Sequence, residues 1–451
     1  MDSNAVLSQV PHSLSAKFEG SFAYLTVRDR LPTILTKVID TIHRNKNNFF
    51  EDYGEEGVEA EKRAIHCLSK LRNELQTDKS VIHLEDTEED VDTWNSYLEY
   101  QQRIQGEQSA VSWFKSPWLY VECYMYRRIQ EALCLNPPMR EFDVFREGKT
   151  QSYMDSLPAI TTLCTHTHNL RHTLAHRHTC SPDNTHTQDN TLMEHLFTLL
   201  QVSLWGNKCD LSISAGQDNS QKASPLDSLA ALRAFILLDE SAAVWSCLQG
   251  SGVGVRVDFI LDNAGFELVT DLLLADFLLA SGLANEVHFH GKRFPWFVSD
   301  VTARDFHWTI SQAASSNHAA VSACGHQWQR YLEEGTWLYH DHAFWTLPHE
   351  YCDMGRVAPD LYALLSSSHL LIFKGDLNYR KLVSDRDWPT HTPFKTALRG
   401  FSPAPLVSLR TLKANVQVGL REGQGEELTK TTPTWMTSGN YAVIQFHTHH
   451  A

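Results

Sequence analysis

The sequence contains no long uninterrupted run of apolar residues. Nowhere in its 451 residues do the apolar positions approach the roughly 18 in a row that a transmembrane helix needs. The first 20 residues also lack the basic segment followed by an apolar core that marks a secretory signal. We therefore expect a cytoplasmic or nuclear protein that has no membrane partner.

Paired cysteines and an excess of basic residues are missing as well. The nine cysteines are odd in number and scattered, and no two form a Cys-x-x-Cys unit, which is typical of a protein with reduced thiols. Lys and Arg number 39 against 54 Asp and Glu, so the net charge is -15. This balance argues against nucleic acid as a partner.

Three common catalytic signatures are absent. The glycines of residues 250–254 come before an apolar run instead of after it, unlike the glycine-rich turn of dinucleotide and S-adenosylmethionine domains. Ala264 stands two residues after Asp262, where a haloacid-dehalogenase phosphatase needs a second aspartate. No Gly-x-Ser-x-Gly elbow of a serine hydrolase occurs.

Hydrophobic residues make up 42% of the chain, and 12 tryptophans are among them, which is enough for a large core shared by two or three units. Apolar residues recur at helical spacing over 28–42 and 58–75, and further helices are indicated over 94–105 and 118–133. No strand is evident before about residue 200. We expect a mostly helical N-terminal domain over residues 20–200.

Residues 164–195 are rich in histidine and threonine and contain two cysteines. This composition raises the alternative of a zinc site. Zinc sites keep compact paired ligands, and the tract has no such unit. We interpret residues 164–195 as a solvated loop.

After a surface linker at residues 216–226, apolar runs alternate with helical patterns up to the C-terminus. Such alternation predicts a mostly parallel sheet between two layers of helices, formed by residues 227–451. The candidate strands lie at 234–238, 257–261, 287–289, 370–373, 407–409 and 441–446.

Three strand-like runs of this region end in a carboxylate. Phe-Ile-Leu is followed by Asp262 and Asn263, Pro-Trp-Phe-Val-Ser by Asp300, and Leu-Leu-Ile-Phe-Lys-Gly by Asp376. Ligands bind parallel sheets outside the carboxyl ends of the strands. Carboxylate and amide oxygens are hard ligands suited to Mg²⁺ or Mn²⁺. The alternative for each single residue is a helix cap, because Asx residues often cap the helix that follows a strand.

Basic residues follow two of the late strands. Arg380 and Lys381 come after Asp376, and Arg410 and Lys413 follow the run at 407–409. Arginine binds phosphate as a planar fork and lysine as a point charge. A metal ion together with cationic side chains around an anionic oxygen is the arrangement that phosphoryl chemistry needs.

Taken together, the segments DNAGFELVTDLLLADFLL, PWFVSD, FKGDLNYRKL and RTLK resemble the damage-control phosphatase family, formerly a domain of unknown function. Residues 410–413 are similar to the Arg-Thr-x-Lys motif of its subfamily III. The resemblance extends from about residue 20 to the C-terminus and fails in the histidine-rich tract and in residues 240–255.

The resemblance implies a Rossmann-like three-layer α/β/α catalytic core, residues 227–451, with a helical N-terminal domain. It implies a divalent metal (Mn²⁺, Co²⁺, Ni²⁺ or Mg²⁺) and small sugar phosphates such as fructose 1-phosphate as substrates. Asn207 and Asp210 match an element placed near the site. The positions matching the metal ligands and catalytic residues are Asp262, Asn263 and Asp300. The positions matching the substrate-binding residues are Asp262, Asn263, Glu267, Asp376, Leu377, Asn378, Tyr379, Arg380 and Lys413.

Two other functions stay open at this point. The resemblance also implies S-adenosylmethionine-dependent methylation of protein glutamates, with acidic protein side chains as acceptors, although the usual methyltransferase loop is missing. A non-enzymatic metal-binding scaffold is the third interpretation. The phosphatase needs metal and releases phosphate, the methyltransferase consumes a methyl donor, and the scaffold survives loss of Asp262.

Overall fold

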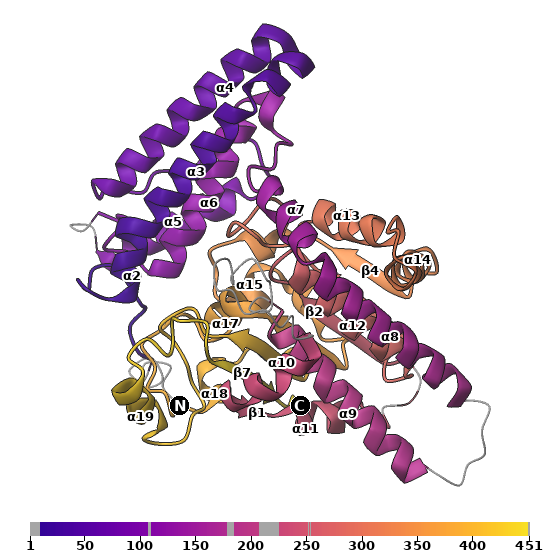
Figure 1. The fold of residues 1–451 in the computed structure, drawn as a ribbon. Coiled ribbons are helices and arrows are strands. Elements are labelled where there is room, and N and C mark those ends of the chain that lie inside the picture. Colours follow the sequence, from indigo (N-terminus) through magenta and orange to yellow (C-terminus); the bar gives the residue numbers. More distant parts are fainter. Residues whose placement is uncertain are drawn as a thin grey trace.

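The computed structural model describes residues 10–106, 110–177, 185–206, 225–250, 252 and 254–449. An elongated helical unit, formed by the first third of the chain, stands on an α/β core (Figure 1). Asn207 and Asp210 lie outside the described residues. Within the described part of the chain, no helix has both the length and the apolar character that a membrane span requires.

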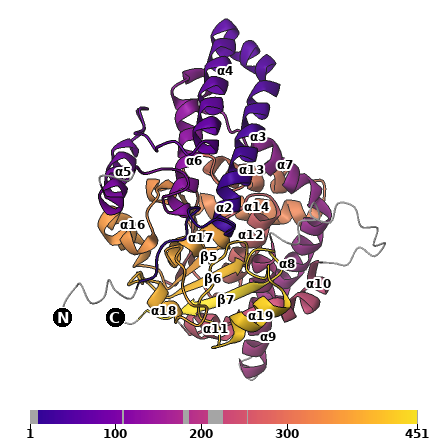
Figure 2. The ribbon, with the colours of Figure 1, turned by 90° about the vertical axis from the view of Figure 1, so that its left-hand side faces the viewer.

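The helical unit confirms the helices expected from the apolar spacing. In α3 (Leu31–Arg44) the buried side chains include Leu31, Leu35, Val38 and Ile42, which share one face of the helix. Figure 2 shows α3, α4 and α6 rising above the sheet. The other elements of this unit are α2 (Phe22–Leu25), η1 (Thr26–Arg30), α4 (Lys46–Gln76), α5 (Val91–Gln105), α6 (Trp118–Cys134), η2 (Pro137–Met139) and α7 (Arg146–Asp155).

The sheet has seven strands in the order β1-β7-β6-β5-β2-β3-β4. The five strands from β6 to β4 are parallel to one another, whereas β7 runs antiparallel to β6 and β1 is parallel to β7. The predicted mostly parallel sheet is therefore confirmed, although the edge strand β4 was missing from the prediction. The strands are β1 (Ile236–Asp239), β2 (Arg256–Ile260), β3 (Glu286–His290), β4 (Trp337–His340), β5 (Leu370–Lys374), β6 (Leu406–Thr411) and β7 (Ala442–His447).

Alternate side chains of each central strand face two different helical layers, which makes a three-layer α/β/α core. In β5, Leu370 and Ile372 pack on one side, and Leu371 and Phe373 pack on the other. The first layer contains α8 (Leu157–Arg177), α9 (Thr185–Leu204), α10 (Pro225–Leu232), α11 (Ser241–Leu248), α12 (Phe266–Ala280), α13 (Ala303–Ala314) and α14 (Ala319–Glu333). The second contains α15 (Met354–Val357), α16 (Pro359–Leu365), α17 (Gly375–Leu382) and α18 (Phe394–Ala397). The remaining short elements are η5 (Arg233–Phe235), η6 (Ala343–Thr346), η7 (Tyr351–Asp353) and α19 (Gln424–Thr431).

Two expectations are corrected. The histidine-rich tract is not a loop over most of its described residues, because α8 and α9 cover it except for residues 178–184, which are not described. Cys164, Leu170 and Leu174 of the tract are buried, and α8 and α9 pack on α12. These two helices thus lie on the core, although the predicted division assigned them to the N-terminal domain.

The second correction concerns the run that ends in Asp300. It was interpreted as strand-like, but residues 291–300 form no strand, and Phe297 and Val298 both have positive φ angles. The segment joins β3 to the turn before α13 and lies under the helical unit. We call residues 291–300 the Asp300 loop.

The chain order places a topological switch point between β2 and β5. From β2 the chain adds β3 and β4 on one side, and then β5 and β6 on the other. Asp262 follows β2, and α17 begins at Gly375 directly after β5. Such a switch point is where open α/β sheets bind their ligands.

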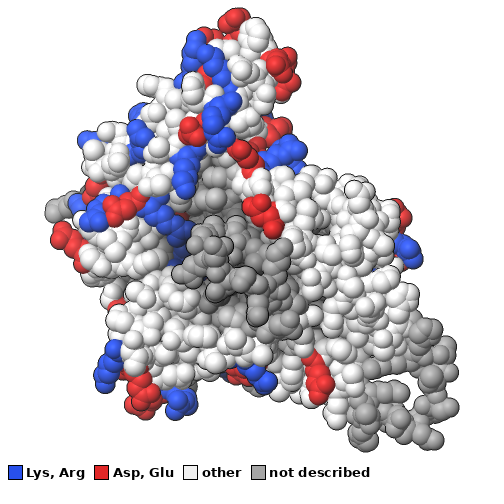
Figure 3. All heavy atoms as spheres, viewed as in Figure 1, with Lys and Arg blue, Asp and Glu red and all other residues white. Residues whose placement is uncertain are grey.

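Acidic and basic side chains mix on the face of the helical unit that Figure 3 shows. On the face shown in Figure 3, Lys and Arg are interspersed with Asp and Glu, and the described residues of this face form no continuous basic surface.

Candidate active site

Asp262 and Asn263 do not cap the helix that follows them. Helix α12 begins at Phe266, its N-cap is Gly265 with a φ of 75°, and no side chain caps it. The positive φ is the reason that glycine stands at the cap position. The capping alternative for Asp262 and Asn263 is therefore wrong, and both side chains need another explanation.

The Asn263 amide joins the groups that were predicted to share a site. Its Nδ2 donates to Asp262 Oδ2 at 2.7 Å and to Glu267 Oε2 at 2.8 Å. Its Oδ1 accepts a hydrogen bond from the hydroxyl of Ser299. Asn263 also pairs with Asp300 through an antiparallel backbone bridge. The structure thus brings the three predicted metal ligands and Glu267 together at one strand end.

Lys292 is a member of this cluster that was not predicted. Its Nζ lies 3.2 Å from Asp300 Oδ2 and donates to the carbonyl oxygen of Leu261 at 3.2 Å. Only 2% of Lys292 is exposed. The signal in the sequence was a lysine placed three residues after the predicted strand at 287–289.

A second buried lysine, also not predicted, holds Glu267. Lys374 ends β5, and its Nζ lies 3.3 Å from Glu267 Oε1 and 3.0 Å from Asp271 Oδ1. It also donates to the carbonyl oxygen of Ser203 at 2.6 Å. These three contacts match the three donors of an ammonium group. Because Lys374 fixes one carboxylate oxygen of Glu267, the other oxygen is held toward Asn263.

The carboxylates outnumber the ammonium groups at this strand end. Burial raises the pKa of Asp262 well above its ordinary value, and Glu267 and Asp300 raise it further. Burial likewise raises the pKa of Asp300 to about 6, although Lys292 opposes the shift. Crowded like charges in a buried site disfavour ionisation unless a cation joins them.

The donor set therefore fits a divalent metal ion. Asp262, Asp300 and the amide of Asn263 offer only oxygen ligands, which hard cations prefer. A doubly charged ion would offset the repulsion that raises the pKa of Asp262 and Asp300. The residues that would hold it are those predicted from the sequence.

Asp376 lies at the start of α17, across the switch point from Asp262. Its Oδ1 accepts hydrogen bonds from Arg410 Nε at 2.8 Å and from the Lys413 backbone N–H at 3.1 Å. Arg410 is fully buried and donates in addition to the carbonyl oxygens of Ala414 and Val416. Arg410 thus shapes the loop that presents Lys413. The Lys413 charge lowers the pKa of Asp262, so its ammonium group acts on the same cluster.

Leu377, Asn378 and Tyr379 are buried within the framework of the site. The Asn378 amide donates to the carbonyl oxygens of Ile260 and Leu261, where β2 ends. Tyr379 packs its ring under the Arg410 guanidinium at 4.1 Å. These residues were predicted to bind substrate, and in the structure Asn378 and Tyr379 hold neighbouring parts of the protein.

Arg380, which was also predicted to bind substrate, pairs with two carboxylates of the protein. Its guanidinium donates to Glu122 Oε2 of α6 at 2.7 Å and to both carboxylate oxygens of Asp385, at 3.0 and 2.9 Å. The group is buried and lies 3.7 Å over the ring of Trp118. Arg380 therefore connects α17 to the helical unit.

Gly375 allows the two sides of the switch point to approach each other. A Cβ atom at this position would lie 1.8 Å from Asp262 Oδ2, and the φ of 78° is one that side chains rarely adopt. Only glycine fits at this position, where the chain leaves β5 and runs beside the Asp262 carboxylate. The position thus explains the glycine of the Lys-Gly-Asp segment.

A different group of residues also has metal-ligand spacing. One ligand atom from each of Glu350, Cys352 and Asp353 lies within 4.8 Å of the others. Glu350 is already paired with Arg386 and Arg399. Burial raises the pKa of the Cys352 thiol to about 11. A neutral thiol beside a neutralised carboxylate is a poor metal site, because the metal binds the thiolate.

Comparison with known proteins identifies the family of this chain. Residues 26–428 match the family model described as the damage-control phosphatase ARMT1-like domain. The chain is 63% identical to damage-control phosphatase ARMT1 of Danio rerio over 447 residues, which cover 98% of each chain. It is 58% identical to the Xenopus tropicalis protein of that name over 445 residues, 97% of this chain and 99% of the relative. It is 55% identical to the Homo sapiens one over 447 residues, 98% and 99% of the two chains.

These matches and the α/β core with its carboxylate cluster define an enzyme of the phosphatase class. The chain belongs to the damage-control phosphatase ARMT1-like family.

Proposed function

We propose that this phosphatase depends on a divalent metal and hydrolyses small sugar phosphates such as fructose 1-phosphate. The observation that carries the proposal is the surplus of buried carboxylates around Asn263, with Asp262 and Asp300 both shifted toward protonation. Asp262, Asn263 and Asp300 would hold Mn²⁺, Mg²⁺, Co²⁺ or Ni²⁺. A bound divalent ion supplies polarisation of a phosphoryl oxygen.

Lys413 is the residue we assign to the phosphate. It is half-buried and lies just after β6. Asp376 fixes this part of the chain by accepting hydrogen bonds from Arg410 and from the Lys413 backbone N–H. Lysine acts as a point charge toward phosphate oxygens and is not a ligand of hard cations. The proposal leaves Arg380 out of phosphate binding, because its buried guanidinium is already paired with the carboxylates of Glu122 and Asp385.

Methylation of protein glutamates with S-adenosylmethionine stays a prediction from the family resemblance. No contact in the described residues favours it over phosphate release. A parallel reaction with S-adenosylmethionine and an acidic protein acceptor separates the two activities, because only methyl transfer consumes the donor and leaves free phosphate unchanged.

The test is phosphate release from a panel of sugar phosphates, with protein stripped by a chelator and then supplied with Mn²⁺ or left without it. We expect phosphate release only when metal is present, and we expect fructose 1-phosphate to be among the compounds hydrolysed. Equal release by the stripped protein would refute the metal requirement. Methyl transfer without any phosphate release would favour the alternative activity.

Lys413→Ala separates substrate binding from metal binding. We expect KM for the sugar phosphate to rise about 10- to 100-fold, the range for losing a hydrogen bond to a charged group. The dissociation constant for Mn²⁺ should stay within about twofold, since Lys413 is no ligand. Lys430→Ala, at an exposed lysine of α19, is the matched control and should change neither value. An unchanged KM in Lys413→Ala would contradict the assignment.

A further inference from the structure

The Asp300 loop contains two consecutive residues in a backbone conformation that side chains disfavour. The φ angle is 43° at Phe297 and 72° at Val298, and Val298 is β-branched. Strain of this kind persists only where the surrounding structure holds it, and it gathers at functional sites. The two residues stand directly before Ser299 and Asp300, which are the groups that meet Asn263.

The helical unit supplies the contact that holds this turn. The ring of Tyr126, on α6, stacks on Phe297 with centroids 4.7 Å apart and planes at 25°. Tyr126 also contacts Trp296 at 5.7 Å. Tyr126 and Trp296 are both buried, at 2% and 0% exposure. The turn is thus packed from above by a side chain that comes about 170 positions earlier in the chain.

The backbone on the other side of the turn is bonded to the site. The Asp300 N–H donates to the Trp296 carbonyl oxygen at 3.1 Å, and the Ser299 carbonyl oxygen accepts from the Ala264 N–H at 2.7 Å. The Ser299 hydroxyl donates to Asn263. The conformation of the turn therefore sets where Asp300 stands relative to Asn263.

The same face of α6 also contacts α17, the helix that begins with Gly375 and Asp376. Trp118, Glu122 and Tyr126 are spaced four residues apart, which puts them on one side of the helix. Trp118 and Glu122 contact the Arg380 guanidinium of α17, which also binds Asp385. We call Trp118, Glu122 and Tyr126 the α6 stripe.

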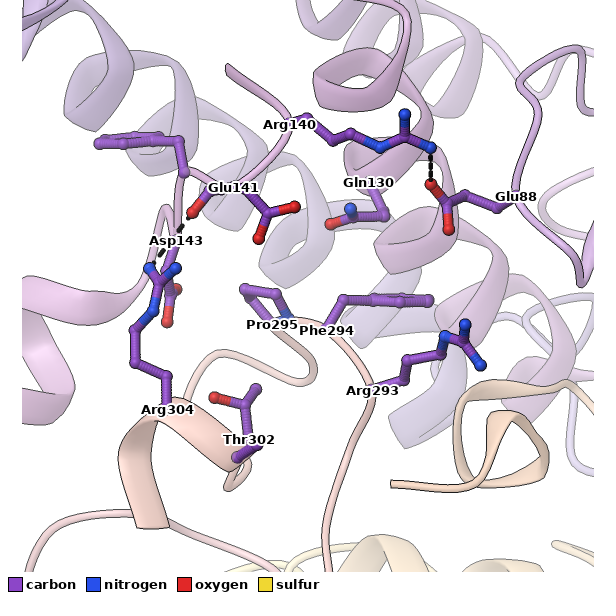
Figure 4. A pocket seen from close by; sticks show the side chains of 12 residues that line it. Glu88, Gln130, Arg140, Glu141, Asp143, Arg293, Phe294, Pro295, Thr302 and Arg304 are labelled. Atoms are coloured by element: carbon purple, nitrogen blue, oxygen red, sulfur yellow. Dashed lines mark hydrogen bonds and ion pairs between the residues drawn. The ribbon is translucent and has the colours of Figure 1, made fainter. Parts of the chain in front are cut away.

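The flank of the loop is tied to the helical unit as well. Arg293 forms an ion pair with Glu89, and Arg304 donates to the Glu141 carbonyl oxygen. Figure 4 shows Phe294 and Pro295 facing Gln130 of α6 in the cavity between the two parts, which measures about 410 Å³. The loop residues Arg293, Phe294 and Pro295 line this cavity.

We propose that α6 is a positioning element for the active site, in which Tyr126 holds the Asp300 loop in its strained conformation and thereby sets the affinity for metal. The step from loop to metal rests on the proposed function of Asp300, whereas the holding of the loop does not. Tyr126 itself contacts no reacting group and acts through Phe297.

The first measurement is hydrogen exchange of the amides of residues 299–301 in metal-free protein. In Tyr126→Leu we expect exchange to accelerate about tenfold, since an aromatic pair contributes roughly that factor beyond its buried area. Tyr126→Phe keeps the ring and should behave as wild type. The matched control is Tyr120→Leu. It removes a buried ring of the same helix, and among the described residues this ring pairs with the rings of Trp94, Tyr97 and Tyr124. Unchanged exchange in folded Tyr126→Leu would overturn the proposal.

A rescue variant distinguishes positioning from general loss of stability. Asparagine tolerates the left-handed region better than valine does. Val298→Asn alone should slow exchange at residues 299–301, and in the Tyr126→Leu background it should restore most of the lost protection. Val298→Asn offers a test even if Tyr126→Leu does not fold. Faster exchange in the single variant Val298→Asn would show that the turn is not strained and would refute the proposal.

The second measurement is titration of the same variants with Mn²⁺ by calorimetry. We expect the dissociation constant to rise about tenfold in Tyr126→Leu, to recover in Tyr126→Phe and in the double variant, and to stay unchanged in Tyr120→Leu. If wild type binds no Mn²⁺ while exchange responds as expected, the metal site fails and the positioning of the loop stands. If wild type binds Mn²⁺ and Tyr126→Leu binds it equally well, the link between loop and metal fails.

Discussion

Replacing Asp262 by asparagine should stabilise the metal-free protein and remove its response to metal. Burial and the neighbouring Glu267 and Asp300 raise the pKa of Asp262 well above its ordinary value, so the charged form is unfavourable in the folded protein without a cation. Asparagine has nearly the same shape but no charge. The substitution therefore relieves repulsion in the apo state and removes the charge that offsets a divalent ion.

Relief of repulsion raises the free energy of unfolding of the metal-free protein, whereas loss of metal binding lowers that of the metal-bound protein. The two changes are comparable in size. Relief of strain at a functional site typically adds about 0.5–2 kcal/mol to the free energy of unfolding. An unfolding entropy of about 2.1 cal/mol/K per residue converts this into a rise in Tm of roughly 1–2 °C for the 451-residue chain. Metal at about 100 times its Kd adds about 2.7 kcal/mol to wild type, or roughly 3 °C.

The assay is thermal unfolding with chelator and with excess Mn²⁺, followed by phosphate release at a temperature where both proteins are folded. Asp262→Asn should melt above wild type in chelator and below it in Mn²⁺, and it should release no phosphate. The control is Asp360→Asn, at a carboxylate whose side chain is 74% exposed, which should melt as wild type in both conditions. An Asp262→Asn protein with the full Mn²⁺ shift and full turnover would refute the metal site.

Two further predictions follow from single positions. Gly375→Ala should lose both stability and the Mn²⁺ shift, because its Cβ would lie 1.8 Å from Asp262 Oδ2; an unchanged Tm shift in Mn²⁺ would contradict this close approach. Burial and the nearby Lys381 lower the pKa of His349 to about 3, below the value of about 6.5 in the unfolded chain. The neutral His349 therefore contributes to the stability of the fold above pH 6.5, and this stability is lost as the pH falls toward 3. His349→Phe, whose ring would keep the stacking on Phe344, should therefore be less sensitive to acid by about 2 kcal/mol at pH 5 in urea titrations. Equal acid sensitivity of the two proteins would show that His349 does not titrate in this way.

Much of the site is encoded locally and could be predicted. A buried strand followed at once by Asp262 and Asn263 places these polar groups at the carboxyl end of the strand, and this does not depend on the rest of the chain. Glu267 follows Asn263 by four residues, and the two side chains meet because Asn263 lies in the turn that leads directly into the first turn of α12. The ends of the predicted strands fall within one residue of those of β2, β3 and β5, because each of these strands is a short apolar run in the sequence.

The missing parts depend on contacts between distant segments. Lys292 and Lys374 are each a single lysine beside an apolar strand, and only the strand order shows that one faces Asp300 and the other Glu267. The helices in the histidine-rich tract were missed because histidine and threonine favour helices weakly. Leu163, Leu170 and Leu174 nevertheless keep a helical spacing, and that signal was present in the sequence.

The Asp300 loop is where local sequence preference and structure disagree most. Pro-Trp-Phe-Val-Ser is rich in aromatic and β-branched residues, which favour strands, yet Phe297 and Val298 take positive φ angles. Such disagreement between local preference and fold is expected at functional sites, where non-local packing offsets the strain. Here that packing comes from Tyr126, in a helical unit that contributes none of the proposed ligands. The geometry of the carboxylate cluster is therefore a property of the whole chain, and the helical unit cannot be removed without changing the position of Asp300.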